Sequence, residues 1–167
     1  MSIVKCTEIV REGDWEKYIS TLMAPDRYRR QLIPIYAFNH EIARIVYNSR
    51  EPMISEIKLR WWEDELTKGL SDGITVRHEI LNPLLKIAVS KQVPLELFLN
   101  ILNARRFDLS NEQHKSLDEQ VDYITNVFSS LFEICLRSCI SSIDEAQIKC
   151  VRNYGFAYGV ANLFLSL

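Results

Sequence analysis

The stretch that decides the fold is residues 36–47, YAFNHEIARIVY, followed by residues 58–66, KLRWWEDEL. In both segments apolar and charged residues recur every three or four positions, which is the spacing of one buried and one polar stripe on an α-helix. Glycine and proline number only five each, and the turn-rich spacing of an all-β chain is missing. The sequence therefore predicts an all-α fold, with the polar stripes as the places where chemistry could lie.

Composition limits the class of protein. With 167 residues, of which 47% are hydrophobic, the chain can bury one sizeable core but not two ordinary domains, so we expect a single domain over residues 1–167. The net charge of -2, with acidic and basic residues interspersed, argues against a nucleic-acid binder. No apolar run approaches the ~20 residues of a membrane span. We therefore expect a cytoplasmic protein, at most peripheral to the inner membrane.

Seven helices with short connections are predicted when the sequence is followed outward from this centre. Their expected ranges are about 14–23, 26–48, 52–70, 76–91, 95–107, 117–140 and 144–167, after a loose lead-in at 1–12. We expect Asp14 to cap the first helix, Pro34 to kink the second or mark its start, and Pro83 to kink the fourth or divide it from a turn.

Apolar spacing also predicts which side chains are buried. In the first three helices these are Trp15, Tyr18, Ile19 and Leu22, then Ile35, Phe38, Ile42, Ile45 and Val46, then Ile54, Ile57, Trp61 and Leu66. Neighbours on a helix point about 100° apart. One of Trp61 and Trp62 is therefore expected in the core, and the other along a cavity, a groove or a partner surface.

The final segment, residues 154–165, becomes more apolar toward its end. Such an end normally packs against something further along a chain. We therefore expect a truncated member of a longer family, and dimerisation is one way in which the apolar surface could be covered.

Familiar local signatures of catalysis are absent from the sequence. The four cysteines lack the CxxC spacing and are interpreted as reduced core residues. His78 and His114 are interpreted as surface residues, whereas His40, on the central helix, is either a half-buried histidine or a site residue.

Two clusters of arginines flank the central helices. Arg27, Arg29 and Arg30 could meet an anionic headgroup or diphosphate, but a solvated basic first turn is the interpretation we favour. Arg105 and Arg106 end the fifth predicted helix, where interaction with the C-terminal dipole is a sufficient structural role.

Several short motifs occur in an order that resembles the squalene/phytoene synthase family. They are residues 29–30 (RR), 36–38 (YAF), 51–52 (EP), 60–62 (RWW), 104–109 (ARRFDL), Tyr123 and residues 154–158 (YGFAY). The resemblance covers nearly the whole chain, but only about the first two thirds of a family domain. It implies a class-I isoprenoid-synthase-like helical domain with a central cavity for prenyl chains. Members of that family join two prenyl diphosphates head to head, using magnesium held by two aspartate-rich helices.

The chain departs from the family's pattern at the first aspartate-rich motif. Alignment on residues 36–38 places His40 at a family arginine, and Ala43, Arg44 and Tyr47 at the three aspartates. Alanine and tyrosine are not ordinary magnesium ligands, and arginine repels the cation, although it can contact a diphosphate or a lipid phosphate directly. The second aspartate-rich helix is expected beyond the end of the chain. We therefore expect no cofactor, and magnesium only if the protein is an active enzyme.

The motifs look most like the divergent branch that includes the phytoene-synthase-related assembly factor of respiratory complex I. The leading hypothesis is a catalytically degenerate protein that binds a lipid, a prenyl diphosphate or a protein partner of respiratory-complex assembly. The alternatives are an active magnesium-dependent prenyltransferase of isoprenoid biosynthesis and a purely structural interaction domain. The candidate ligand-binding residues are Tyr36, Asn39, His40, Arg44, Tyr47, Arg60, Trp62 and Tyr123. No catalytic residue and no metal ligand is assigned.

Overall fold

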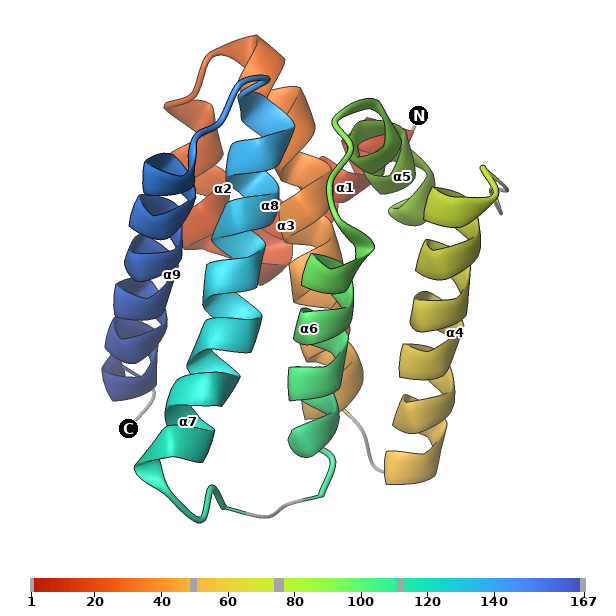
Figure 1. Ribbon diagram of the computed structural model, residues 1–167. Helices are drawn as coiled ribbons and strands as arrows, with labels where there is room; N and C mark the ends of the chain where they lie inside the picture. Colours follow the sequence, from red (N-terminus) through yellow and green to blue (C-terminus); the bar gives the residue numbers. More distant parts are fainter. Residues whose placement is uncertain (1, 49–50, 74–76, 111–112, 166–167) are drawn as a thin grey trace.

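The computed structural model describes residues 2–48, 51–73, 77–110 and 113–165. Within these residues every regular element is helical, which confirms the all-α prediction. The elements are α1 (Ser2–Gly13), α2 (Trp15–Leu22), α3 (Asp26–Tyr47), α4 (Pro52–Ser71), α5 (Leu81–Ser90), α6 (Leu95–Phe107), α7 (Leu117–Ile124), the π-helical segment η1 (Thr125–Ser129), α8 (Ser130–Cys139) and α9 (Glu145–Leu165). Figure 1 shows α9, α7 with α8, α6 and α4 side by side, with α3 behind them.

Local sequence signals explain where several helices begin and end. Asp14 caps α2 by accepting a hydrogen bond from the backbone N–H of Lys17 at 3.1 Å, as predicted. Pro52 occupies the first turn of α4, where its missing N–H costs nothing. Gly73 follows the C-cap of α4 with a φ of 68°, a conformation that glycine adopts without strain.

The central helix α3 packs against α1, α2, α4, α5, α6 and α8. All five residues of its predicted stripe are buried, which confirms that stripe. Phe38 contacts the rings of Trp62 and Phe98 edge-on at 5.5 Å and 5.6 Å and so joins α3 to α4 and α6. The prediction that Pro34 starts the helix is wrong, because α3 continues through it from Asp26 to Tyr47.

Two predictions near the N-terminus differ from the structure. The lead-in at residues 1–12 is mostly helix, because α1 buries Cys6 and Val10 against α3. Of the predicted stripe of α2 only Tyr18 packs against the core; Trp15, Ile19 and Leu22 are exposed, and the buried residues are Lys17 and Thr21.

On α4 the predicted stripe is only partly buried. Leu66 lies in the core, but Ile54, Ile57 and Trp61 are exposed, and the buried side chains are instead Leu59 and Trp62. Because α4 is at the edge of the bundle and packs mainly on α3, α5 and α6, one narrow face is sufficient to cover it.

Two further helices differ in their bounds from the predicted ones. The fourth begins at Leu81, with Pro83 in its first turn, so the proline follows a turn rather than kinking a longer helix. Val76, where we expected this helix to start, lies outside the described residues. The predicted helix 117–140 is realised as α7, η1 and α8, with η1 packed against α9.

The four cysteines are free, but only Cys6 and Cys135 are buried; Cys139 is half-buried and Cys150 is exposed, so the core interpretation is wrong for Cys150. Burial raises the pKa of each buried thiol to about 12, which keeps the thiols protonated and unreactive. Over the described ranges, no helix has the length and apolar character that a membrane span requires.

Candidate functional site

A cavity of about 280 Å³ lies between α3, α7 with η1, and α9. Lys17 of α2 and Arg105 of α6 complete its wall. The other lining residues are Asp14, Asn39, His40, Ala43, Tyr47, His114, Gln120, Tyr123, Ile124, Phe128, Gly159, Asn162 and Leu163. Polar side chains thus gather toward α3 and α6, while Ile124, Phe128 and Leu163 supply an apolar side.

Half of the candidate ligand-binding residues meet at this cavity. Asn39, His40, Tyr47 and Tyr123 line it, so α3 and α7 bring them together from distant parts of the sequence.

The other four candidates lie elsewhere. Tyr36 is buried in the core, and burial and the neighbouring thiol of Cys135 raise its pKa. Trp62 is also a core residue, and Arg60 is exposed on α4. Arg44 turns toward a different pocket, described below.

The polar end of the cavity is organised by Arg105, which is buried. Its Nη1 donates hydrogen bonds to the hydroxyls of Tyr123 and Tyr47, at 2.7 Å and 3.1 Å, and lies 3.3 Å from Oδ2 of Asp108. The hydroxyl of Tyr123 donates in turn to the same carboxylate oxygen at 2.7 Å. This closed network of Tyr47, Arg105, Tyr123 and Asp108 is the Arg105 network.

The surroundings of Arg105 and Tyr123 raise the pKa of both side chains. Burial acts to lower the pKa of Arg105, but Tyr123, Tyr47 and Asp108 raise it by more, so it stays above its usual range. Burial, together with Asp108, raises the pKa of Tyr123 despite the opposing charge of Arg105. The arginine is therefore a permanent cation, and the tyrosine is a permanent hydrogen-bond donor.

A second ion pair lies on the α2 side of the cavity. Nζ of Lys17 contacts Oδ2 of Asp14 at 2.6 Å and the hydroxyl of Tyr158, on α9, at 3.3 Å. Burial acts to lower the pKa of Lys17, but Asp14 and Tyr158 raise it above its usual range. Both cations of the cavity wall are therefore paired with carboxylates, and the cavity carries little net charge.

His40 lines the cavity and packs against Gly13 at the end of α1. A Cβ on Gly13 would come within 2.2 Å of the imidazole, so only glycine fits there while His40 keeps this position. Burial lowers the pKa of His40 in spite of the opposing charges of Asp14 and Glu41. The half-buried interpretation of His40 is confirmed.

The other two histidines are half-buried, so the surface interpretation is wrong for both. Nδ1 of His78 accepts the backbone N–H groups of Ile80 and Leu81 at 3.3 Å and 3.1 Å, which caps α5. The ring of His114 stacks on Phe107 with centroids 4.4 Å apart.

The residues at the family's metal motif do not fit magnesium. Ala43 lines the cavity without a donor atom, Tyr47 is bound to Arg105, and Arg44 is a cation. The carboxylate on the cavity wall, Asp14, is occupied by Lys17. In the part of the chain that the structure describes, no three His, Cys, Asp or Glu side chains are grouped to hold a metal ion. Hard divalent cations need several oxygen ligands, and these residues do not supply them.

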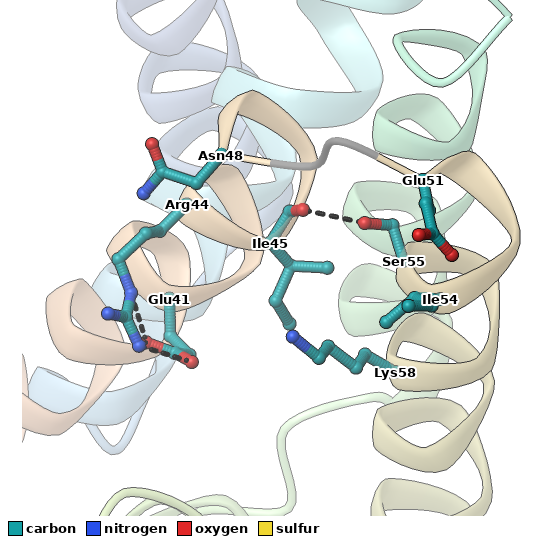
Figure 2. A pocket seen from close by; sticks show the side chains of 8 residues that line it. All are labelled: Glu41, Arg44, Ile45, Asn48, Glu51, Ile54, Ser55 and Lys58. Carbon is teal, nitrogen blue, oxygen red and sulfur yellow. Dashed lines mark hydrogen bonds and ion pairs between the residues drawn. The ribbon is translucent and has the colours of Figure 1, made fainter.

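Arg44 lines a pocket of about 370 Å³ between α3 and α4, which Figure 2 shows from close by. Its guanidinium binds the carboxylate of Glu41 through two hydrogen bonds of 3.0 Å. On the other side of this pocket, Oγ of Ser55 donates to the carbonyl oxygen of Ile45 at 2.8 Å and ties α4 to α3. The sequence-based expectation that Arg44 contacts a phosphate directly stays a prediction.

Sequence reasoning missed the site role of Arg105, which was assigned to the helix dipole. A signal was available, because Phe98, Ile101, Leu102 and Arg105 follow one another at helical spacing on the buried face of α6. A charged residue that continues an apolar stripe needs a buried partner. Lys17 was missed in a similar way, since α2 was placed with its apolar side inward.

Comparisons with known proteins agree with the motifs. A family model described as squalene/phytoene synthase matches residues 10–166. A homolog of assembly factor 6 of NADH dehydrogenase (ubiquinone) complex I from Drosophila melanogaster is 27% identical over 97% of this chain and 49% of its own length. The corresponding homolog from Dictyostelium discoideum is 26% identical over 92% of the chain and 43% of its own length. The human protein of that name is 23% identical over 78% of the chain and 39% of its own length.

Among solved structures, a dehydrosqualene synthase in complex with ligand matches with a TM-score of 0.82 and 17% sequence identity, over 96% of this chain and 55% of that chain. This likeness confirms the class-I isoprenoid-synthase-like fold. The chain spans about half the length of that structure, and half or less of the three relatives named above.

Proposed function

Because the chain belongs to the squalene/phytoene synthase family, we propose that it is a catalytically degenerate member that acts in the assembly of respiratory complex I. In this proposal it works by binding a lipid or isoprenoid in its cavity and a protein partner on its surface. The names of the relatives from fly, slime mould and human support the assembly role. Since the chain matches only part of each relative, the role of the whole protein belongs to the proposal.

The observation that carries the proposal is the Arg105 network. Tyr47 stands where the family has its third metal-binding aspartate, and its hydroxyl accepts a hydrogen bond from Arg105. Neither Tyr47 nor Ala43 supplies a carboxylate at this point, so the oxygen ligands that a divalent cation needs are missing. Without such a cation the charge of a leaving diphosphate is not neutralised, so prenyl transfer is disfavoured.

The cavity still has the chemistry of a binding site. Its apolar side can cover a hydrocarbon segment, while Asn39 and His40 offer polar groups to the end of a ligand. A volume of about 280 Å³ is at the lower end for small-molecule sites, which favours one acyl or isoprenoid segment over two whole prenyl diphosphates. A lipid or isoprenoid ligand is found in membranes, so the protein would bind it at a membrane surface. We therefore propose that the protein is cytoplasmic and peripheral to the inner membrane.

A gene deletion in the source organism tests the assembly role. We expect complex I to be lost on native gels and NADH:ubiquinone activity to fall, while succinate oxidation stays unchanged, and the wild-type gene to restore complex I. Normal complex I in the deletion strain would overturn this role. Magnesium-dependent release of diphosphate from farnesyl diphosphate by the purified protein would overturn catalytic degeneracy.

A cavity-filling variant tests the ligand separately. Ala43→Trp places an indole in the cavity, whereas Ala157→Trp, at an exposed position of α9, is the matched control. We expect the control to restore complex I in the deletion strain and Ala43→Trp, once shown to be folded, to fail. Full restoration by a folded Ala43→Trp would contradict ligand binding while leaving the assembly role intact.

A further inference from the structure

Helix α2 is amphipathic, but of its apolar side chains only Tyr18 packs against the core, and the others point away from it. Trp15, Ile19 and Leu22 are 60%, 39% and 41% exposed, and Met23 at the end of the helix is 85% exposed. Lys17, on the opposite face, is only 8% exposed. Trp15, Ile19, Leu22 and Met23 form the α2 face. A soluble helix normally buries its apolar side, so this orientation requires a reason.

Polar contacts hold α2 in this orientation. Lys17 is bound to Asp14 and Tyr158, which turns its side of the helix toward the cavity. Arg29 donates to the carbonyl oxygens of Thr21, Leu22 and Ala24 at 3.1–3.3 Å and so fixes the C-terminal end of α2. Rotating the apolar side inward would break both sets of contacts. Polar contacts of the neighbouring residues therefore keep the α2 face exposed to solvent.

Cations lie next to the α2 face. Directly after Met23 the chain carries Arg27, Arg29 and Arg30 against one acidic residue, Asp26. Arg30 is paired with Asp26 at 2.8 Å, while Arg27 is exposed and stacks on the ring of Tyr28. An apolar face with a tryptophan at one end and an excess of arginine at the other is complementary to a bilayer that has anionic headgroups.

We propose that the α2 face docks the protein on an anionic lipid surface, with Trp15, Ile19, Leu22 and Met23 in the headgroup region and Arg27 against lipid phosphates. This proposal rests on the peripheral location proposed above and adds the surface that makes the contact. Its evidence is the exposed α2 face and the arginines that follow it, so its test requires no cavity ligand. A second copy of the chain or another protein on the same face would be a different outcome of the test.

Flotation with lipid vesicles tests the proposal on the 167-residue chain. We expect binding to vesicles of phosphatidylcholine with 30% phosphatidylglycerol, and binding about tenfold weaker to phosphatidylcholine alone or at high salt. Trp15 fluorescence should shift to shorter wavelength on binding, and Trp15→Phe should abolish that shift although Trp61 and Trp62 remain. Absence of binding, or equal binding to neutral vesicles, would overturn the proposal.

A matched pair of variants separates the α2 face from general hydrophobicity. Met23→Asp should weaken vesicle binding at least about tenfold, since it places a carboxylate in the headgroup region. Met53→Asp, at a position of α4 that is 76% exposed, should have no effect. Equal effects of the two variants would overturn the proposal, as would a dimer on gel filtration that Met23→Asp dissociates. Failed vesicle binding with normal complementation would overturn docking but leave the assembly role standing.

Discussion

Nη1 of Arg105 donates a hydrogen bond of 2.7 Å to the hydroxyl of Tyr123, although 18 residues and a loop separate them. The same nitrogen reaches Tyr47 on α3, 58 residues away. One buried guanidinium therefore joins α3, α6 and α7 at the polar end of the cavity. This position gives Arg105 a structural role in the fold as well as an electrostatic role in the site.

Replacing Arg105 should destabilise the protein. Arg105→Met keeps an unbranched apolar stem but leaves Asp108 and two tyrosine hydroxyls without their shared donor. We expect the free energy of unfolding to fall by about 2–3 kcal/mol, measured by urea denaturation. Arg105→Lys should recover only part of the loss, because one ammonium cannot reproduce the guanidinium geometry.

Arg106 is the matched control for this substitution. It is the next residue on α6, but it lies nearer the surface and pairs with Glu56 and Glu63 of α4. Because exposed ion pairs contribute little, Arg106→Met should lower the free energy of unfolding by about 1 kcal/mol or less. Equal losses for Arg105→Met and Arg106→Met would contradict a special role for the Arg105 network.

The contrast between these arginines shows what the sequence could predict. The helix 95–107 was predicted with the bounds that α6 has, because its apolar spacing is local and regular. The hydrogen-bond partners of Arg105 come from α3 and α7. A local sequence pattern does not predict which helices pack against one another. Fold class and the central stripe of α3 could be predicted for this reason, whereas the wall of the cavity could not.

The orientation of α2 was wrong for a related physical reason. Hydrophobic periodicity assumes that the apolar side is buried, but here Lys17 finds partners inside the bundle. The contacts of Lys17, with Asp14 at the N-cap of α2 and with Tyr158 on α9, thus outweighed the burial of Trp15 and Leu22. Asn39, Tyr47 and Tyr123, which the family resemblance indicates as candidate ligand-binding residues, do line the cavity, but their binding of a ligand stays a prediction.

Stability should decrease between pH 7.5 and 5.5 because of two histidines. Burial lowers the pKa of His40 and His78 below the usual value of a histidine, about 6.5. The unfolded state then binds more protons in this range, so stability that is fully present above about pH 6.5 is lost as the pH falls through the folded-state pKa values. For His78 the geometry agrees, because Nδ1 can accept backbone N–H groups only when it is unprotonated. Urea denaturation at a series of pH values measures the slope.

The double variant His40→Gln and His78→Gln is the control for this pH dependence. It should be less stable than the wild type at pH 7.5, since the cap of α5 is lost, but its stability should be nearly constant down to about pH 5.5. An unchanged slope in the double variant would assign the effect to other groups.

The two neighbouring tryptophans should differ in their contribution to stability. Trp62 is buried and packs edge-on against Phe38, whereas Trp61 is partly exposed. Trp62→Ala should lower the free energy of unfolding by about 3–5 kcal/mol, and Trp61→Ala by about 1 kcal/mol. Thermal unfolding of both variants checks this, and comparable losses would show that α4 is oriented differently on α3.

The packing of α9 on η1 depends on two glycines that should differ in their tolerance of a methyl group. A Cβ on Gly155 would lie 2.7 Å from both the carbonyl oxygen of Phe128 and Cα of Ser129, which are backbone atoms that cannot rotate away. A Cβ on Gly159 would meet the Phe128 ring and a methyl group of Ile124, which can shift. We expect Gly155→Ala to cost about 2–3 kcal/mol and Gly159→Ala about 1 kcal/mol in urea denaturation. Phe128→Leu should rescue Gly159→Ala but not Gly155→Ala, and equal rescue of both would mean that α9 shifts as a rigid body.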